Sequence, residues 1–181
     1  YKDTRTGEIT TEVGDYCVTT IPPAVLNGIP NDFSDRCKAA IAAPTNSQVG
    51  KLALQMNRRF WEEDDHIFGG SSQTDTPGHS IYYPSHDYLS EKGILQSYYM
   101  IGPNSIYRRS LDAQVEFGLV NGEKLHPGQF RNHYDGQAFS VAWHQVPYSS
   151  GGWETWSADA RREHFPVLLE RQGRTFFAGQ Y

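Results

Sequence analysis

The clearest hydrophobic pattern along the chain is an alternation in residues 50–60, where Leu52, Leu54 and Met56 fall on one side. Lys51 falls on the other side. A period of two is typical of a strand with one buried face. We therefore predict a strand over residues 50–60, with Lys51 directed away from the apolar layer.

Weaker patterns predict the remaining elements. Short β-rich runs predict strands at residues 15–21, 80–84, 93–101, 138–143 and 174–178. Helical spacing predicts helices at residues 24–29, 34–42 and 104–119. Residues 61–77 and 147–152 are expected to be loops, and residues 159–169 mix helical and extended character around Pro166. The expected class is α+β with a mixed sheet.

Composition narrows the class of protein. The chain has 181 residues and a net charge of -5, with 13% aromatic residues, so it can form a full core and is not disordered. The acidic balance argues against nucleic acid as a partner. No apolar run approaches the roughly 20 residues of a membrane span. Three arginine doublets are expected on solvated faces: Arg58-Arg59, Arg108-Arg109 and Arg161-Arg162.

Motif searches exclude several kinds of site. The chain has no glycine-rich phosphate loop, no CxxC, no HExxH and no GxSxG. The seven histidines are scattered, so no metal site is expected. The acidic run at residues 62–65 is expected to be a solvated turn. Cys17 and Cys37 are expected to be buried free thiols, and a disulfide between them is the alternative.

Two further expectations come from the residues alone. The chain begins with Tyr1, and the apolar run at residues 174–178 is followed almost at once by the last residue, so we expect an internal piece of a larger protein. An acidic chain rich in Tyr and Trp, punctuated by Gly and Pro, also fits an extracellular binding module whose aromatic side chains stack on sugars. A purely structural subunit is a third alternative. The sequence leaves the cellular compartment undecided.

Five segments resemble the flavin-containing L-amino acid oxidases, which belong with the monoamine oxidases. The most specific are KLALQMNRRFWEEDDHIFGGSSQTD (51–75) and IYYPSHDY (81–88). DYCVTTIPPAVL (15–26) resembles a late strand of the FAD domain, WHQVPYSSGGW (143–153) a segment beside the flavin, and FFAGQY (176–181) the last FAD-domain strand. Bacterial L-glutamate oxidases are among the relatives with this general likeness.

The resemblance implies an organisation. Residues 1–30 would be a late FAD-domain segment, residues 31–150 the substrate-binding domain, and residues 151–181 a return to the FAD domain. The glycine-rich N-terminal half of the family and its C-terminal helix lie outside the chain. We therefore expect partner chains that carry these parts, made by proteolytic processing or as separate subunits, and a dimer of such assemblies.

The resemblance also implies roles for two residues of the predicted sheet. Lys51 matches the lysine that holds a water near flavin N5, where a cation would stabilise developing negative charge. Tyr98 matches a tyrosine that donates a hydrogen bond to the substrate carboxylate. Tyr99 is the alternative, because neighbouring strand residues point to opposite faces and a one-residue slip would exchange them.

Further contacts to cofactor and substrate are implied elsewhere. Trp143 would lie against the flavin, and Trp153 in the substrate pocket. Gly179 and Gln180 match the family's Gly-Glu contact to FAD, with glutamine as a departure from the pattern. Thr20 would lie near the cofactor.

The implied reaction is oxidation of an L-amino acid with oxygen and water to a 2-oxo acid, ammonia and hydrogen peroxide. The cofactor would be FAD, which carries the redox chemistry. Related alternatives are a flavin amine oxidase without a carboxylate clamp and an amino-acid 2-monooxygenase, which give different products.

Overall fold

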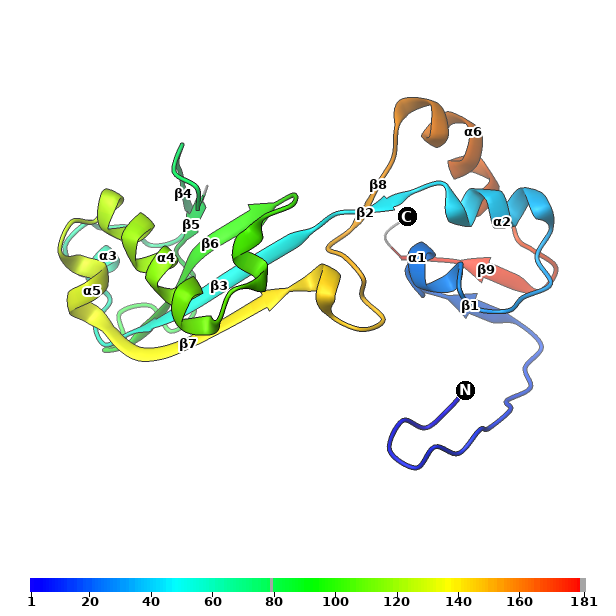
Figure 1. Ribbon diagram of the computed structural model, residues 1–181, viewed down its shortest axis with the longest axis horizontal. Helices are drawn as coiled ribbons and strands as arrows, with labels where there is room; N and C mark the ends of the chain where they lie inside the picture. The colour runs from blue at the N-terminus through cyan, green and yellow to red at the C-terminus, as the bar shows by residue number, and fades with distance from the viewer. Residues whose placement is uncertain (79, 180–181) are drawn as a thin grey trace. The chain divides into compact units, whose positions relative to one another are not determined.

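The computed structural model of the protein describes residues 1–78 and 80–179, which separate into two compact units (Figure 1). One unit is residues 46–152; the other joins residues 1–45 to those from 153 onward. The sequence placed the first division at residue 30. The structure places it later because α2 (Asp35–Ala42) packs against α6 (Ala158–Leu168). The assignment of the units to substrate-binding and FAD domains stays a prediction.

The unit of residues 46–152 is built on a five-stranded sheet in the order β4-β5-β6-β3-β7. Its strands are β3 (Val49–Met56), β4 (Ser71–Gln73), β5 (Ser80–Tyr82), β6 (Gly93–Ile101) and β7 (Tyr134–Ala142). Neighbouring strands in this sheet are antiparallel, so the expectation of a mixed sheet is wrong here. Parallel pairing needs a crossover connection, and the described parallel pair lies in the other unit.

One face of this sheet is closed by helix α4 (Leu111–Leu125), which packs against β3, β6 and β7 (Figure 1). Ser110 begins the helix, and its hydroxyl accepts a hydrogen bond from the Ala113 N–H at 3.3 Å. Leu52, Leu54 and Met56 are fully buried, which confirms the predicted alternation. Short helices complete the unit: α3 (Phe60–Glu63), η1 (Ser105–Arg108), α5 (Gln129–His133) and η2 (Trp143–Gln145).

Three predicted boundaries in this unit are wrong. The strand predicted over residues 50–60 ends at Met56, since α3 begins at Phe60. The predicted loop at residues 61–77 contains β4. The helix predicted over residues 104–119 begins at Leu111 and continues through Gly122 to Leu125. Gly122 does not end it because this glycine packs directly against the Phe130 ring, where a Cβ would lie 2.2 Å from a ring carbon.

The other unit contains a two-stranded parallel sheet of β1 (Cys17–Thr19) and β9 (Thr175–Phe177). Helices α1 (Pro23–Leu26), α2 and α6 form its core, and β2 (Thr45–Asn46) pairs with β8 (Glu154–Thr155). Residues 158–168 form one helix with Pro166 in its last turn, although proline removes one backbone hydrogen bond there.

The two cysteines of this unit differ. Both are free, but Cys17 is exposed and only Cys37 is buried, so the expectation that both are buried is wrong for Cys17. Burial raises the pKa of the Cys37 thiol. Across the described residues, no helix has the length and apolarity needed to cross a membrane.

Candidate functional site

Lys51 lies on the sheet face opposite α4, as its strand pattern predicts. It is half-buried in β3, the strand flanked by β6 and β7, and is paired with Tyr99 on one side and Val141 on the other. Its ammonium nitrogen lies 4.6 Å from the centroid of the Tyr99 ring. Lys51 forms no ion pair with a carboxylate among the described residues. Its described charge contact is the cation–π interaction with the Tyr99 ring.

Tyr98 lies on the closed face instead. It is fully buried, and its hydroxyl donates a hydrogen bond to Gln114 Oε1 of α4 at 2.7 Å. The Ser140 hydroxyl donates to the same oxygen. Burial raises the pKa of Tyr98. The hydroxyl predicted to bind a substrate carboxylate is therefore already engaged within the unit, and the predicted role of Tyr98 stays untested.

Tyr99 occupies the face that carries Lys51. It is half-buried, and its ring lies 5.6 Å from that of Tyr82 in β5. Burial raises the pKa of Tyr99, so its hydroxyl is held in the protonated, hydrogen-bond-donating form. The structure thus brings Lys51 together with the alternative tyrosine rather than with Tyr98.

The two predicted tryptophans belong to different units. Trp143 opens η2 directly after β7, and 38% of its surface is exposed. Trp153 is half-buried and precedes β8. Between them, Gly151 and Gly152 pack on Asn46 and Val49, where a Cβ would lie 2.7 Å and 2.5 Å from side-chain atoms.

Thr20 and Gly179 meet at the carboxyl ends of the parallel strands β1 and β9. Gly179 has φ +115°, and a Cβ there would lie 3.8–3.9 Å from Thr20 atoms. The Ala178 N–H donates to the Thr19 carbonyl at 3.0 Å, which fixes the two strand ends side by side. Ligands of α/β folds bind at such strand ends. Gln180, predicted to contact the cofactor, lies outside the described residues.

The acidic run that we expected to be solvated is paired with cations. Glu62 is buried and forms an ion pair with Arg59, which is only 2% exposed. Glu63 and Asp64 both pair with Arg58. The prediction of solvated residues is wrong for Arg59 and Glu62, because α3 places them one turn apart and the Pro84 and Lys92 carbonyls accept further hydrogen bonds from the Arg59 guanidinium.

A hydrogen-bonded chain of side chains was not predicted. His126 Nδ1 lies 2.8 Å from Asp65 Oδ2, and its Nε2 lies 2.7 Å from the Tyr83 hydroxyl, which contacts Ser72 Oγ at 2.8 Å. No sequence signal could have revealed it, since His126 and Asp65 are 61 residues apart. The described part of the chain contains no group of three or more His, Cys, Asp or Glu suited to a metal ion.

Comparisons with known proteins show which family the chain belongs to. Residues 2–181 match the family model described as flavin containing amine oxidoreductase. An L-amino-acid oxidase of Siganus canaliculatus is 28% identical over 100% of the chain, and one of Protobothrops flavoviridis is 33% identical over 72%. The chain spans only 35% and 26% of these two relatives.

The fold is also found among solved structures. Wild-type putrescine oxidase bound to putrescine aligns with a TM-score of 0.74 over 91% of the chain and 36% of its own, at 12% identity. This likeness shows the fold alone. The family match favours an enzyme over the sugar-binding module that composition had left open. The chain belongs to the flavin containing amine oxidoreductases, the family that includes the L-amino-acid oxidases, and FAD is the cofactor that this membership implies.

Proposed function

We propose that the chain is part of an FAD-dependent L-amino acid oxidase, which converts an L-amino acid, oxygen and water into a 2-oxo acid, ammonia and hydrogen peroxide. The observation that carries the proposal is the family match across residues 2–181, together with the L-amino-acid oxidases among the similar proteins. FAD, when bound, supplies the two-electron redox chemistry.

The residues at the carboxyl ends of the parallel strands β1 and β9 fit FAD. Thr20 is exposed and offers a hydroxyl, and Gly179 has no side chain to block a ligand beside it. Its positive φ is one that glycine alone adopts without strain. We assign Thr20 and Gly179 to the binding of FAD, and Trp143, with its exposed indole, to packing on the ring system.

Lys51 provides the positive charge that the proposed redox step needs. Its ammonium group has no carboxylate partner among the residues that the structure describes, so it is available to stabilise negative charge and to hold a water. The paired β3 backbone fixes its position. Tyr99 beside it is a protonated phenol that can donate a hydrogen bond to a carboxylate. We propose that Lys51 serves the redox step, that either Tyr99 or Tyr98 orients the substrate, and that Trp153 shapes the substrate pocket.

L-Glutamate is the substrate that we propose to test first. Its side-chain carboxylate needs a cationic partner. Arg58 and Arg59 are already paired with acidic residues of α3 and its C-terminal end, so they do not meet this need. The partner then comes from another arginine or from parts of the enzyme outside the chain. We propose that those parts are carried by other chains in a dimeric assembly, which a denaturing gel of the native protein would resolve.

The experiment that tests the oxidase is a product assay on the complete assembly. We expect a flavin absorption spectrum, and hydrogen peroxide with an equal amount of 2-oxo acid from a panel of L-amino acids. An aldehyde from a simple amine, or an amide from the amino acid, would instead assign the related amine oxidase or 2-monooxygenase reactions. A colourless native protein would contradict the proposal.

A further inference from the structure

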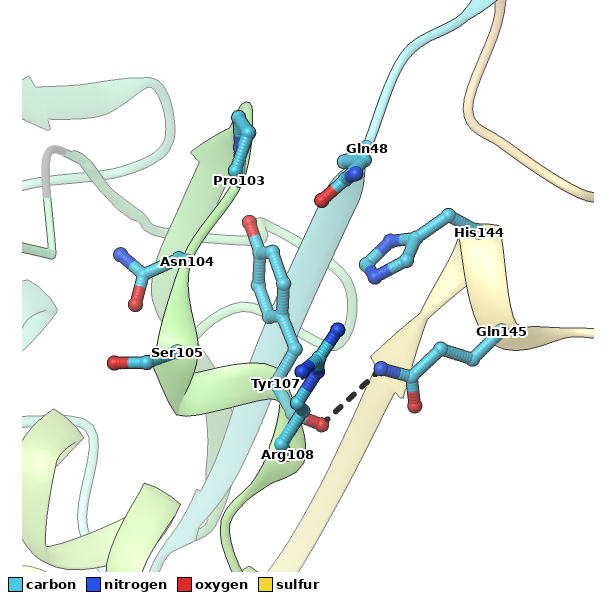
Figure 2. A pocket seen from close by; sticks show the side chains of 8 residues that line it. All are labelled: Gln48, Pro103, Asn104, Ser105, Tyr107, Arg108, His144 and Gln145. Atoms are coloured by element: carbon cyan, nitrogen blue, oxygen red, sulfur yellow. Dashed lines mark hydrogen bonds between the residues drawn. The ribbon is translucent and has the colours of Figure 1, made fainter.

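An open hollow of about 450 Å³ lies where β3 begins and β7 ends, within the unit of residues 46–152 (Figure 2). No Asp or Glu is among its lining residues. The polar side chains of the lining are Gln48, Asn104, Ser105, Arg108, His144 and Gln145. Hydrogen-bond donors without any carboxylate are the lining that an anion requires.

The floor of the hollow is preformed. The Tyr107 ring packs on Gly50 so closely that a Cβ there would lie 2.1 Å from a ring carbon. The Tyr107 hydroxyl donates to the Met100 carbonyl at 3.0 Å, and Gln145 Nε2 donates to the Tyr107 carbonyl at 3.5 Å. The His144 ring lies 5.0 Å from the Tyr107 ring. These contacts hold the Tyr107 ring in place beneath the donors.

Two of the lining side chains carry polar atoms without a described partner. Arg108 forms no ion pair with any residue that the structure describes. His144 Nδ1 is buried without a hydrogen-bond partner in the same part of the chain. Because Nδ1 is enclosed, Nε2 is the ring nitrogen that remains to contact a ligand. Figure 2 shows Arg108 and His144 turned towards the same space.

We propose that this hollow binds a small organic carboxylate, with the Arg108 guanidinium as its main anchor and His144 Nε2 as a second donor. The volume is that of a small-molecule site rather than of a bare ion. A single guanidinium matches one carboxylate, while the glycine-rich loop that would favour a phosphate is missing. The hollow lies over the sheet face opposite Lys51, because Gly50 faces Tyr107 and its strand neighbour faces away.

The test is a titration of the complete protein with glutarate, its neutral diamide glutaramide and inorganic phosphate, followed by calorimetry and by the imidazole ¹⁵N signals of His144. We expect saturable millimolar binding of glutarate, none of glutaramide, and a shift of the His144 signals. Arg108→Gln should weaken binding by about tenfold, the value of one charge-assisted pair. Arg109→Gln is the matched control, since Arg109 is exposed next in the chain but does not line the hollow.

Each other outcome overturns the proposal. These outcomes are no saturation by glutarate, binding of phosphate but not glutarate, equal weakening by Arg109→Gln, or glutarate binding that leaves the His144 signals unmoved. Arg108 is exposed, so its replacement leaves the fold intact, and a thermal melt of the variant verifies this. Since the readout is binding, the result does not depend on whether the enzyme oxidises amino acids.

Discussion

The two faces of the five-stranded sheet are made by the same strands but differ in burial and chemistry. On the face beneath α4, Leu52 and Leu54 are fully buried. On the opposite face, Lys51 is half-buried, and Phe139 and Ile94 are 69% and 49% exposed. Burial of apolar area on the first face holds the strands in register, and this fixes the side chains of the second in space.

The neighbours Tyr98 and Tyr99 show what this difference means for function. Tyr98 donates its hydroxyl to Gln114 and so joins helix to sheet. Tyr99 lies under the Lys51 ammonium on the other face. One residue of register therefore separates a tyrosine whose hydroxyl is bonded to α4 from one that lies beside Lys51.

The largest effect that separates the faces should come from Leu52→Ala. We expect a loss of about 2–5 kcal/mol in the free energy of unfolding, because a fully buried leucine leaves a cavity. Phe139→Ala on the open face should change it by less than about 0.5 kcal/mol. Urea denaturation measures both. Equal losses for the two variants would show that the open face is packed as well as the closed one.

The alternation over residues 50–56 was predictable from sequence, because a period of two with Leu52, Leu54 and Met56 has one structural meaning. The segment of residues 51–75, whose specific part begins at Phe60-Trp61, also indicated the family that the comparison confirms. Element ends were less predictable. Gly122 normally suggests the end of a helix. Here, however, the Phe130 ring of α5 occupies the space that a side chain at residue 122 would need, and this is a tertiary contact that no local pattern contains.

The site could be predicted only in part. The sequence placed Lys51 on the correct face because one strand suffices for that inference. It could not choose between Tyr98 and Tyr99, since a register shift between Leu52 and Ala53 in the pairing with β6 decides which tyrosine lies opposite Lys51. The burial of Arg59 with Glu62 was missed because a run of charges ordinarily indicates solvent.

A second large effect should appear at high pH through Tyr107, which is buried against Gly50. Burial raises the pKa of Tyr107 from 10.0 to about 12. The neutral phenol thus stabilises the folded state below pH 10, and this contribution is lost as the pH rises through the folded value. We expect a loss of roughly 2 kcal/mol by pH 12, approaching about 3 kcal/mol above it, at about 1.36 kcal/mol for each pKa unit.

The Tyr107→Phe variant isolates this effect from that of other buried tyrosines. Its free energy of unfolding, measured from pH 8 upwards, should fall less steeply than that of the unmodified protein. Identical slopes would mean that Tyr107 titrates as if exposed, and that the packing against Gly50 opens in solution.

The paired variants Tyr98→Phe and Tyr99→Phe should differ by about 1 kcal/mol in stability. Tyr98→Phe removes a buried hydrogen bond to Gln114, whereas the Tyr99 hydroxyl has no described intramolecular hydrogen bond to lose. Tyr99→Phe should raise the KM for the amino acid, if Tyr99 is the tyrosine that orients substrate. A KM that rises only in Tyr98→Phe would return that role to Tyr98.

The smallest change in stability should come from Lys51→Met, at about 0.5 kcal/mol or less, because it removes one cation–π contact on the open face. The same variant should slow flavin reoxidation and turnover strongly, since the positive charge is lost where negative charge is proposed to develop. Lys51→Arg keeps the charge and should recover part of the rate. A structural lysine would give the reverse pattern, with lower stability and unchanged reoxidation, so the ratio of the two effects decides whether the open face carries chemistry.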